Sequence, residues 1–413
     1  MPPAGPRATL AAVRNPFAAP GFPRYWLASL AAGTGLGTLT VTVPLYIRDR
    51  VGLEARGLAI AAALVAQTLP GAILALLGGA VADRSERRVV LVRTYGIVAA
   101  VSTLFAALVA LDVRQVWPII PLAMIVGSAA AFTNPARQSL VPQLVSRTQL
   151  QNGVIFGNMG YMAAFQFLGP MAAGFTVDLA GLGVAFALEV GLLALAAALF
   201  WGVRTPQPAP SGASIRDDLR AGVRYVAGEP ALRGLLLLGT VVGVFFIGPF
   251  SVTVPIVVPD VFGASDRWVG ILWGCFGAGV FAGSIALTLR PLPRRGLAVC
   301  LANVSGGIVL CLYSQSSLLW LSVVLLFVWG LGASVFMNYV ISLLQEHTAP
   351  PMMGRVMSMY SLVFFASMPV GYAQAGLVTR GFGPEATLLS SGVVAALIGV
   401  ACLVLWKPVR DLR

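Results

Sequence analysis

Residues 57–88 read GLAIAAALVAQTLPGAILALLGGAVADRSERR, an apolar stretch that ends in a cluster of charged side chains. Residues 57–80 carry no charge, and these 24 residues exceed the roughly 20 that a helix needs to cross a bilayer. A strand of a membrane β-barrel would alternate apolar and polar side chains, whereas this run is continuously apolar. The stretch therefore predicts a transmembrane helix followed by a charged connector.

The same pattern recurs along the whole chain. Of its 413 residues, 58% are hydrophobic and only 10% are charged, whereas a soluble domain is about 25% charged. We expect an all-α polytopic membrane protein with twelve transmembrane helices. Their predicted ranges are 25–47, 57–80, 89–110, 115–134, 152–175, 183–203, 233–258, 268–289, 296–314, 318–344, 355–379 and 386–406. All chemistry must then take place among the helices.

The excess of basic residues predicts the topology. The chain has 27 Lys and Arg against 15 Asp and Glu, and the basic residues lie in short connectors rather than in one aromatic-interleaved patch, so a nucleic-acid partner is not expected. With the N-terminus inside, 21 basic residues fall on the cytoplasmic side and 6 outside, which places both termini in the cytoplasm of a bacterial-type inner membrane. Because 21 and 6 account for all 27, we expect no Lys or Arg in the membrane core.

A polar stretch near the middle divides the chain. Residues 206–214 form the Pro- and Ser-rich segment PQPAPSGAS, and residues 215–226 alternate apolar and basic side chains at helical spacing. We expect an N-terminal six-helix bundle over 1–203, a cytoplasmic linker with an amphipathic helix over 204–232, and a C-terminal six-helix bundle over 233–413.

The charged cluster after the second span has the composition of a conformational latch. An acid at a helix end beside several arginines can make charge-assisted bonds in one state and release them in another. A small residue before it would let another helix come close. The residues concerned are Gly79, Asp83, Arg84, Arg87 and Arg88. The alternative is that these charges only determine topology.

This stretch resembles the signature of the major facilitator superfamily between spans 2 and 3, with Glu86 standing where a glycine is usual. The Gly169-Pro170 pair of span 5 is similar to a motif of exporters in that superfamily. Residues 132–153, FTNPARQSLVPQLVSRTQLQNG, and 345–361, QEHTAPPMMGRVMSMYS, resemble its branch of macrolide and siderophore exporters.

The resemblance implies two pseudo-symmetric six-helix bundles, a cavity between them and access that alternates between the two sides. It also extends the latch to the glycine-proline pair of span 5 and to the connectors after spans 4 and 10, where Arg137 and Arg355 occupy corresponding places. The residues added are Arg137, Gly169, Pro170, Gly354 and Arg355.

The spans that line the cavity in this family carry neutral polar and aromatic side chains here, which we expect to contact substrate. They are Thr34, Thr38, Gln67, Asn158, Tyr161, Gln166, Phe246, Trp273, Asn338, Tyr339 and Gln374. The alternative for each is structural: threonines bond their own helix, amides bond a neighbouring helix and aromatic rings pack. Glu189 is the only acid well inside a span, and it either carries protons or bonds a neighbouring helix.

We therefore expect a secondary active transporter that works as a monomer and needs no cofactor or metal. Its substrate would be an amphiphilic, neutral or cationic small molecule, drug-like or siderophore-like, exported by proton antiport. A lysophospholipid flippase or a solute uptake symporter on the same fold is the first alternative, and a non-transporting membrane receptor is the second. An enzyme would need clustered His, Cys, Asp or Glu inside the spans, where Glu189 stands nearly alone.

Overall fold

The computed structural model describes the backbone of residues 15–203 and 215–412, and the side chains of these ranges except 75–84, 215–219 and 221. Within the described residues the fold is helical and without strands. The helices are α2 (Phe22–Arg48), α3 (Leu53–Arg84), α4 (Arg87–Ala110), α5 (Ile119–Leu144), α6 (Leu150–Ala163), α7 (Gly169–Trp201), α8 (Ile215–Gly228), α9 (Pro230–Val241), α10 (Gly248–Asp260), α11 (Arg267–Leu289), α12 (Arg295–Ser314), α13 (Leu319–Glu346), α14 (Met353–Leu405) and α15 (Lys407–Arg410). Short 3-10 turns lie at Pro16–Ala18 and Pro350–Met352, and π-helical turns η2 and η3 at Ala164–Leu168 and Val242–Ile247.

Ten helical stretches of the described chain are long and apolar enough to cross a membrane. Two of them, Leu150–Trp201 and Pro350–Leu405, have 52 and 56 residues, far more than one crossing requires. Each contains one glycine in the left-handed region, Gly181 at φ 85° and Gly383 at φ 89°, where two helices meet at a kink. Only glycine adopts this conformation readily, so these positions allow the chain to reverse. The twelve crossings remain a prediction that these breaks favour.

One predicted boundary is wrong. Helix α5 continues to Leu144, ten residues beyond the predicted end at 134. The polar sequence Asn134-Pro135-Ala136-Arg137 has the composition of a connector, but here it lies inside the helix and Arg137 is fully buried. A basic residue thus lies inside a helix that is long and apolar enough to cross a membrane, where the sequence predicted a connector.

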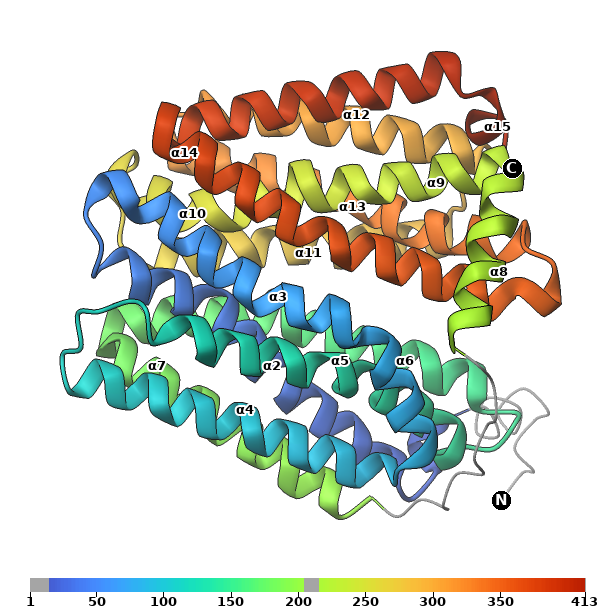
Figure 1. Cartoon of the computed structure of the whole chain (residues 1–413), viewed down its shortest axis with the longest axis horizontal. Helices are drawn as coiled ribbons and strands as arrows, with labels where there is room; N and C mark the ends of the chain where they lie inside the picture. The colour runs from blue at the N-terminus through green and yellow to red at the C-terminus, as the bar shows by residue number, and fades with distance from the viewer. Residues whose placement is uncertain (1–14, 204–214, 413) are drawn as a thin grey trace, which may run out of the picture.

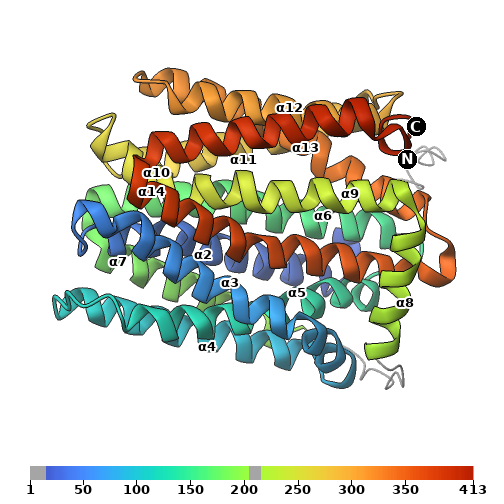
Figure 2. The same cartoon turned by 45° about the horizontal axis from the view of Figure 1, so that its top comes forward.

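The helices form two packed groups that lie side by side (Figure 1). In the first group α2 packs on α7, α3 on α5 and α4 on α7; in the second α11 packs on α13, and α12 and α10 on α14. The groups meet where α3 contacts α14 and α7 contacts α11. Figures 1 and 2 both show α8 running across one end of the bundle, the end at which the C-terminus lies. We call this the linker end.

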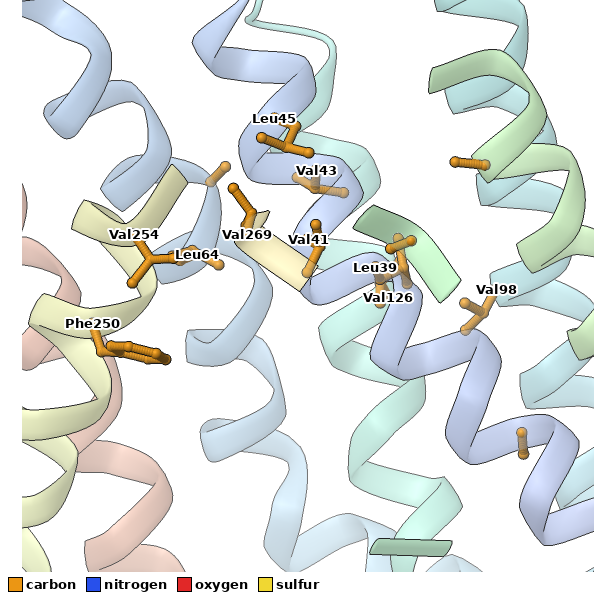
Figure 3. Close-up of a cluster of buried hydrophobic side chains, with 14 of the residues drawn as sticks. Leu39, Val41, Val43, Leu45, Leu64, Val98, Val126, Phe250, Val254 and Val269 are labelled. Atoms are coloured by element: carbon orange, nitrogen blue, oxygen red, sulfur yellow. The ribbon is translucent and has the colours of Figure 1, made fainter. Parts of the chain in front are cut away.

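The centre of the molecule is apolar. Buried side chains of α2, among them Leu39, Val41 and Leu45, meet side chains of α3, α5, α10 and α11 (Figure 3). Helix α2 is buried along most of its length, unlike the other helices of its group. The burial of apolar side chains on all of its faces places α2 between the two groups rather than against lipid.

The two groups contain matching close approaches of backbone. In the first, a Cβ on Gly169 of α7 would lie 2.5 Å from the Thr34 carbonyl oxygen of α2. In the second, a Cβ on Gly248 of α10 would collide with the backbone of Gly371 in α14. Both glycines precede a proline and follow a π-helical turn, as expected where a proline removes a backbone hydrogen bond.

Candidate functional site

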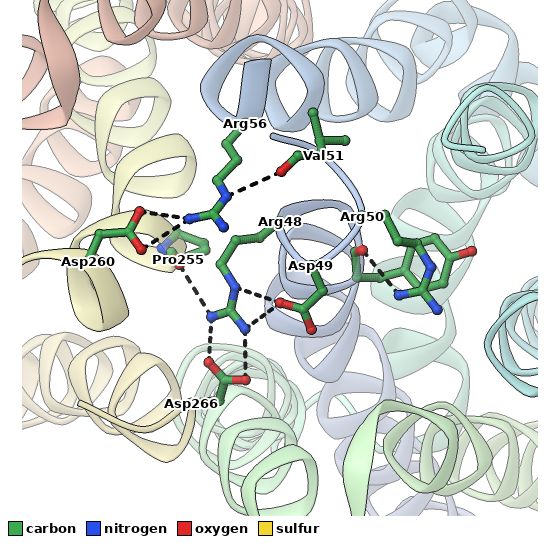
Figure 4. Close-up of polar contacts among 9 residues, drawn as sticks. Arg48, Asp49, Arg50, Val51, Arg56, Pro255, Asp260 and Asp266 are labelled. Atoms are coloured by element: carbon green, nitrogen blue, oxygen red, sulfur yellow. Dashed lines mark hydrogen bonds and ion pairs between the residues drawn. The ribbon is translucent and has the colours of Figure 1, made fainter. Parts of the chain in front are cut away.

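The end of the bundle opposite α8 holds an ion pair between the two groups of helices (Figure 4). Arg48, the last residue of α2, donates from Nη1 and Nη2 to the two carboxylate oxygens of Asp266, at 2.5 and 3.0 Å. The same guanidinium donates to Asp49 Oδ1 from Nε and Nη2, at 2.8 and 2.6 Å. The Arg48 side chain is only 9% exposed, so two carboxylates compensate one nearly buried cation.

Two further ion pairs join the groups at this end. Arg56 Nη1 at the start of α3 donates to both carboxylate oxygens of Asp260, at 3.0 and 2.8 Å. Arg267 of α11 lies 3.8 Å from the Asp178 carboxylate of α7. We call this end, with the pairs Arg48–Asp266, Arg56–Asp260 and Arg267–Asp178, the ion-pair end.

Sequence reasoning missed these pairs, because it interpreted the arginines of the connectors only as topology signals. A signal was available. Arg48 and Arg56 flank the predicted connector after span 1, and Asp260 and Asp266 lie in the connector after span 7, the matching position of the second half. Opposite charges on matching connectors favour contact once a pseudo-symmetric fold is assumed.

Small residues bring the two groups into backbone contact near the ion-pair end. A Cβ on Gly57 of α3 would lie 2.5 Å from Thr379 Cγ2 of α14. On the other side, a Cβ on Gly174 of α7 would lie 2.8 Å from the Gly270 Cα atom of α11. A Cβ on Gly270 would also collide with the carbonyl oxygen of Pro170. Of the predicted latch residues, Pro170 thus takes part in a contact between the groups.

The remaining latch residues are distributed differently. Arg87 Nη1 donates to the Ser139 carbonyl of α5 at 3.2 Å, and Arg88 Nη1 donates to the Trp201 carbonyl of α7 at 3.4 Å. Both bonds stay inside the first group. Glu86, which replaces the glycine usual in the signature, forms an ion pair with Arg88. The side chains of Asp83 and Arg84 and the surroundings of Gly79 lie outside the described part of the structure.

At the linker end, Arg355 is in contact with α8. A Cβ on Gly222 of α8 would lie 3.3 Å from the Arg355 carbonyl oxygen, and the Tyr225 hydroxyl accepts a hydrogen bond from the Ala349 N–H at 3.1 Å. Gly354 is exposed and a Cβ there would meet nothing within 4 Å, so no close helix approach requires this glycine.

Several predicted substrate contacts follow the structural alternative. Thr34 Oγ1 donates to the Leu30 carbonyl at 2.9 Å, and buried Thr38 Oγ1 donates to the Thr34 carbonyl at 2.9 Å. The Tyr339 hydroxyl accepts from the Leu292 N–H at 2.7 Å and fixes the connector after α11.

Two of the predicted aromatic contacts are also packed inside the protein. Tyr161 is buried with its ring 3.8 Å from the guanidinium carbon of Arg137. The ring of Phe246 is buried 5.7 Å from that of Trp329. Their direct contact with substrate is therefore not favoured in this state.

Other predicted residues keep polar atoms available. Gln67 and Asn158 are half-buried. Asn338 is exposed on α13, but its Nδ2 donates to Ser284 Oγ of α11 at 3.0 Å and to the Ser334 carbonyl at 2.7 Å, as the structural alternative expects for an amide. Gln166 Nε2 lies 3.6 Å from the Met162 sulfur. Gln374 is half-buried, and its Oε1 has no hydrogen-bond partner among the described residues.

Trp273 belongs to an aromatic cluster of α10, α11 and α13. Its ring meets that of Phe250 edge-on at 4.6 Å, and Trp329 packs against Phe250 and Phe276 at 5.2 and 4.9 Å. Trp273 Nε1 is buried and finds no acceptor in the described part of the chain. A buried indole N–H usually has a partner, so this donor is suited to a ligand acceptor. We call these four residues the aromatic cluster.

Glu189 lies in the first group between α7 and α4. It is fully buried, and the Ser102 hydroxyl of α4 donates to its Oε1. Its Oε2 has no hydrogen-bond partner among the described residues. Beside it, the rings of Phe105 and Phe186 stack at 5.3 Å. The bond to a neighbouring helix, one of the two readings expected from the sequence, is therefore present.

Comparison with known proteins agrees with this architecture. Residues 11–412 match the family described as transmembrane secretion effector. Macrolide efflux protein A of Streptococcus pyogenes is 23% identical over 376 residues, 88% of this chain and 90% of that protein. Enterobactin exporter EntS of Escherichia coli is 24% identical, with 95% of this chain and 94% of that protein covered.

Solved structures share the fold. The nucleoside transporter NupG matches with a TM-score of 0.72 at 13% identity, over 94% of this chain and 99% of that one. A bacterial homolog of the human lysosomal transporter Spinster matches with the same TM-score and identity, over 94% and 97%. The chain is thus a multi-pass membrane transporter of small molecules rather than an enzyme. It belongs to the transmembrane secretion effector family of the major facilitator superfamily.

Proposed function

We propose that this transporter exports amphiphilic small molecules by alternating access, with protons as the counter-ion. The observation that carries the proposal is the joining of the two helix groups at the ion-pair end by three ion pairs and two glycine crossings. Contacts of this kind can form and break as units, which is what a gate on one side of a transport pathway requires.

The ion-pair end is assigned to the outer face of a bacterial inner membrane. The assignment rests on the distribution of basic residues, 21 on the side of the termini and 6 on the other. The described state is then closed toward the outside. In this proposal the bundles over 1–203 and 233–413 rock against each other in a monomer, and the linker over 204–232 joins them on the cytoplasmic side.

The aromatic cluster supports an amphiphilic substrate. Its rings offer apolar contact area, and Trp273 Nε1 offers a hydrogen-bond donor. The relatives named as macrolide and enterobactin exporters support outward transport of large organic molecules. Fully buried Arg137 is not exposed to such a molecule in the described state.

Glu189 is the proposed proton carrier. It is a carboxyl group enclosed within the helices, and one of its oxygens has no hydrogen-bond partner among the described residues. Replacement by Gln retains the acceptor for Ser102 but removes the titratable group, so the Gln variant separates proton coupling from helix packing.

The proposal is tested by efflux of a panel of dyes and lipophilic drugs from proteoliposomes, with and without an imposed proton gradient. Wild type should move at least one compound only when the gradient is present, and Glu189→Gln should lose this gradient-driven flux. Ser102→Ala, which keeps the carboxyl group, is the matched control and should retain it.

Other outcomes identify the alternatives. Gradient-driven flux that persists in Glu189→Gln would move proton coupling to another residue. Transport of fluorescent lysophospholipid, or accumulation of a solute with the gradient, would replace export by the flippase or the symporter. Absence of flux for every compound would favour a receptor.

A further inference from the structure

A guanidinium is enclosed within the first group of helices without an anionic partner among the described residues. Arg137 on α5 has no exposed surface, and Nε, Nη1 and Nη2 all lack a hydrogen-bond partner in the described chain. It takes part in none of the ion pairs found there. Arginine remains protonated in proteins, so this is a buried positive charge with five N–H donors.

Tyrosines from three other helices surround this charge. The ring of Tyr161 on α6 faces the guanidinium carbon at 3.8 Å, and the Tyr25 hydroxyl on α2 donates to the Arg137 carbonyl oxygen at 3.3 Å. Tyr95 on α4 is fully buried, its hydroxyl has no partner among the described residues, and it shares the ring of Phe200 as a neighbour with Tyr25. The ring of Tyr95 stacks on Phe200 at 5.6 Å.

These contacts leave the charge only partly compensated. A ring face attracts a cation but accepts none of its in-plane hydrogen bonds in the way that an anion does. A buried charge without a counter-charge is strongly unfavourable, and so is a buried hydroxyl without a partner. The unpartnered groups are hydrogen-bond donors on α5 and α4, so the species that satisfies them must be an acceptor with negative charge.

The burial limits the size of this species. Arg137 and Tyr95 are fully buried, Tyr25 is 1% exposed and Tyr161 is 5% exposed. An organic anion or a lipid headgroup would need an open face at which its remaining atoms could leave the site. We propose that Arg137 and Tyr95 bind a single inorganic anion of about the size of chloride, within the N-terminal bundle and separate from the aromatic cluster.

The proposal is tested on the purified full-length protein in detergent by the melting temperature, read from tryptophan fluorescence. Sodium chloride is titrated against sodium gluconate at constant ionic strength, so that general screening does not change. An anion that binds only the folded state should raise the melting temperature with the logarithm of its concentration once that exceeds the dissociation constant, by about 2–4 °C at roughly a hundred times the dissociation constant. Bromide should replace chloride, whereas the larger divalent sulfate should not.

Three variants make the test specific. Arg137→Gln should abolish the chloride-dependent rise. Tyr95→Phe keeps the stacked ring. It should raise the chloride dissociation constant obtained from the titration by about tenfold or more, as loss of a hydrogen bond to a charged group does. Arg93→Gln removes an exposed arginine from α4, and its melting temperature should rise with chloride as that of the wild type does.

The outcomes that overturn the proposal are also defined. A wild-type melting temperature that is the same in chloride and gluconate would exclude a chloride site and indicate a counter-charge supplied by the chain. A rise that Tyr95→Phe leaves unchanged would exclude this site even if Arg137→Gln does not fold. Because the readout is stability, either result leaves the transport proposal untouched.

Discussion

Replacing Asp266 by Asn should open the ion-pair end. The change removes the negative charge that Arg48 meets across the two helix groups, while Asn keeps the shape and one oxygen acceptor. Because Asp266 directly precedes α11 and Arg48 ends α2, their pair exists only when the two groups are together at this end. The substitution should therefore change the balance between closed and open states more than the folding of either group.

The magnitude follows from the surroundings of the pair. Breaking a fully buried ion pair by removing one partner costs about 3–5 kcal/mol. Here the Asp266 side chain is 20% exposed, and Asp49 still accepts two hydrogen bonds from the Arg48 guanidinium. Arg48 is thus not left uncompensated, and we expect a loss of about 2 kcal/mol. At about 1.4 kcal/mol per factor of ten, the closed state should lose roughly 30-fold in relative population.

The assay is the distance between two spin labels across the ion-pair end. Leu111→Cys, after α4, and Val261→Cys, after α10, place labels at exposed sites of the two groups in a chain whose four native cysteines have been replaced. Double electron–electron resonance then gives the populations of short and long distances. Asp266→Asn should shift the distribution toward the long distance.

Two control variants distinguish the pair from a general charge effect. Asp49→Asn removes a carboxylate from the same guanidinium but within the first helix group, so it should leave the short distance dominant. Asp112→Asn breaks an exposed pair with Arg114 at the same end and should have no effect. An unchanged distribution in Asp266→Asn, or an equal opening in Asp49→Asn, would refute the assignment of a gate to Arg48 and Asp266.

Three further predictions concern the same closed state and the cavity. Gly270→Ala should shift the spin-label distances toward the long value, because its Cβ would collide with the Pro170 carbonyl oxygen. The control is Gly96→Ala, whose Cβ would meet nothing within 4 Å and which should leave the distances unchanged. The same distance distribution in both variants would contradict the role of the Gly174–Gly270 crossing. Arg56→Gln should destabilise the closed state by about 1 kcal/mol, less than Asp266→Asn does, since both side chains of the Arg56–Asp260 pair are partly exposed. High salt should reduce the difference between this variant and wild type in the spin-label assay. Trp273→Phe should keep the aromatic packing but lose the free indole N–H. The dissociation constant of a transported dye that accepts hydrogen bonds, measured by fluorescence titration, should therefore rise about fivefold or more. An unchanged dissociation constant would place Trp273 outside the cavity.

Most of the long helices could be predicted from the sequence because they are continuous apolar runs between charges. The two breaks at Gly181 and Gly383 fall between predicted spans 5 and 6 and between predicted spans 11 and 12. Local composition failed at Arg137, since the polar residues around it have the signature of a connector and only the surrounding helices make that stretch part of α5. Two of the three pairs at the ion-pair end join residues more than 200 positions apart, such as Arg48 and Asp266, and no local pattern specifies such a pairing.

The two kinds of contact at the ion-pair end have complementary consequences for a gate. The crossing of Gly174 and Gly270 brings backbones together without ordering any long side chain, so its formation costs little conformational entropy and it depends on close fit. The Arg48–Asp266 pair acts over a longer distance and depends on charge. Approaching groups would be attracted first through the charges and then held by the backbone fit. A gate built in this way should close readily yet remain sensitive to one charge, which is why a single carboxylate is expected to shift its equilibrium.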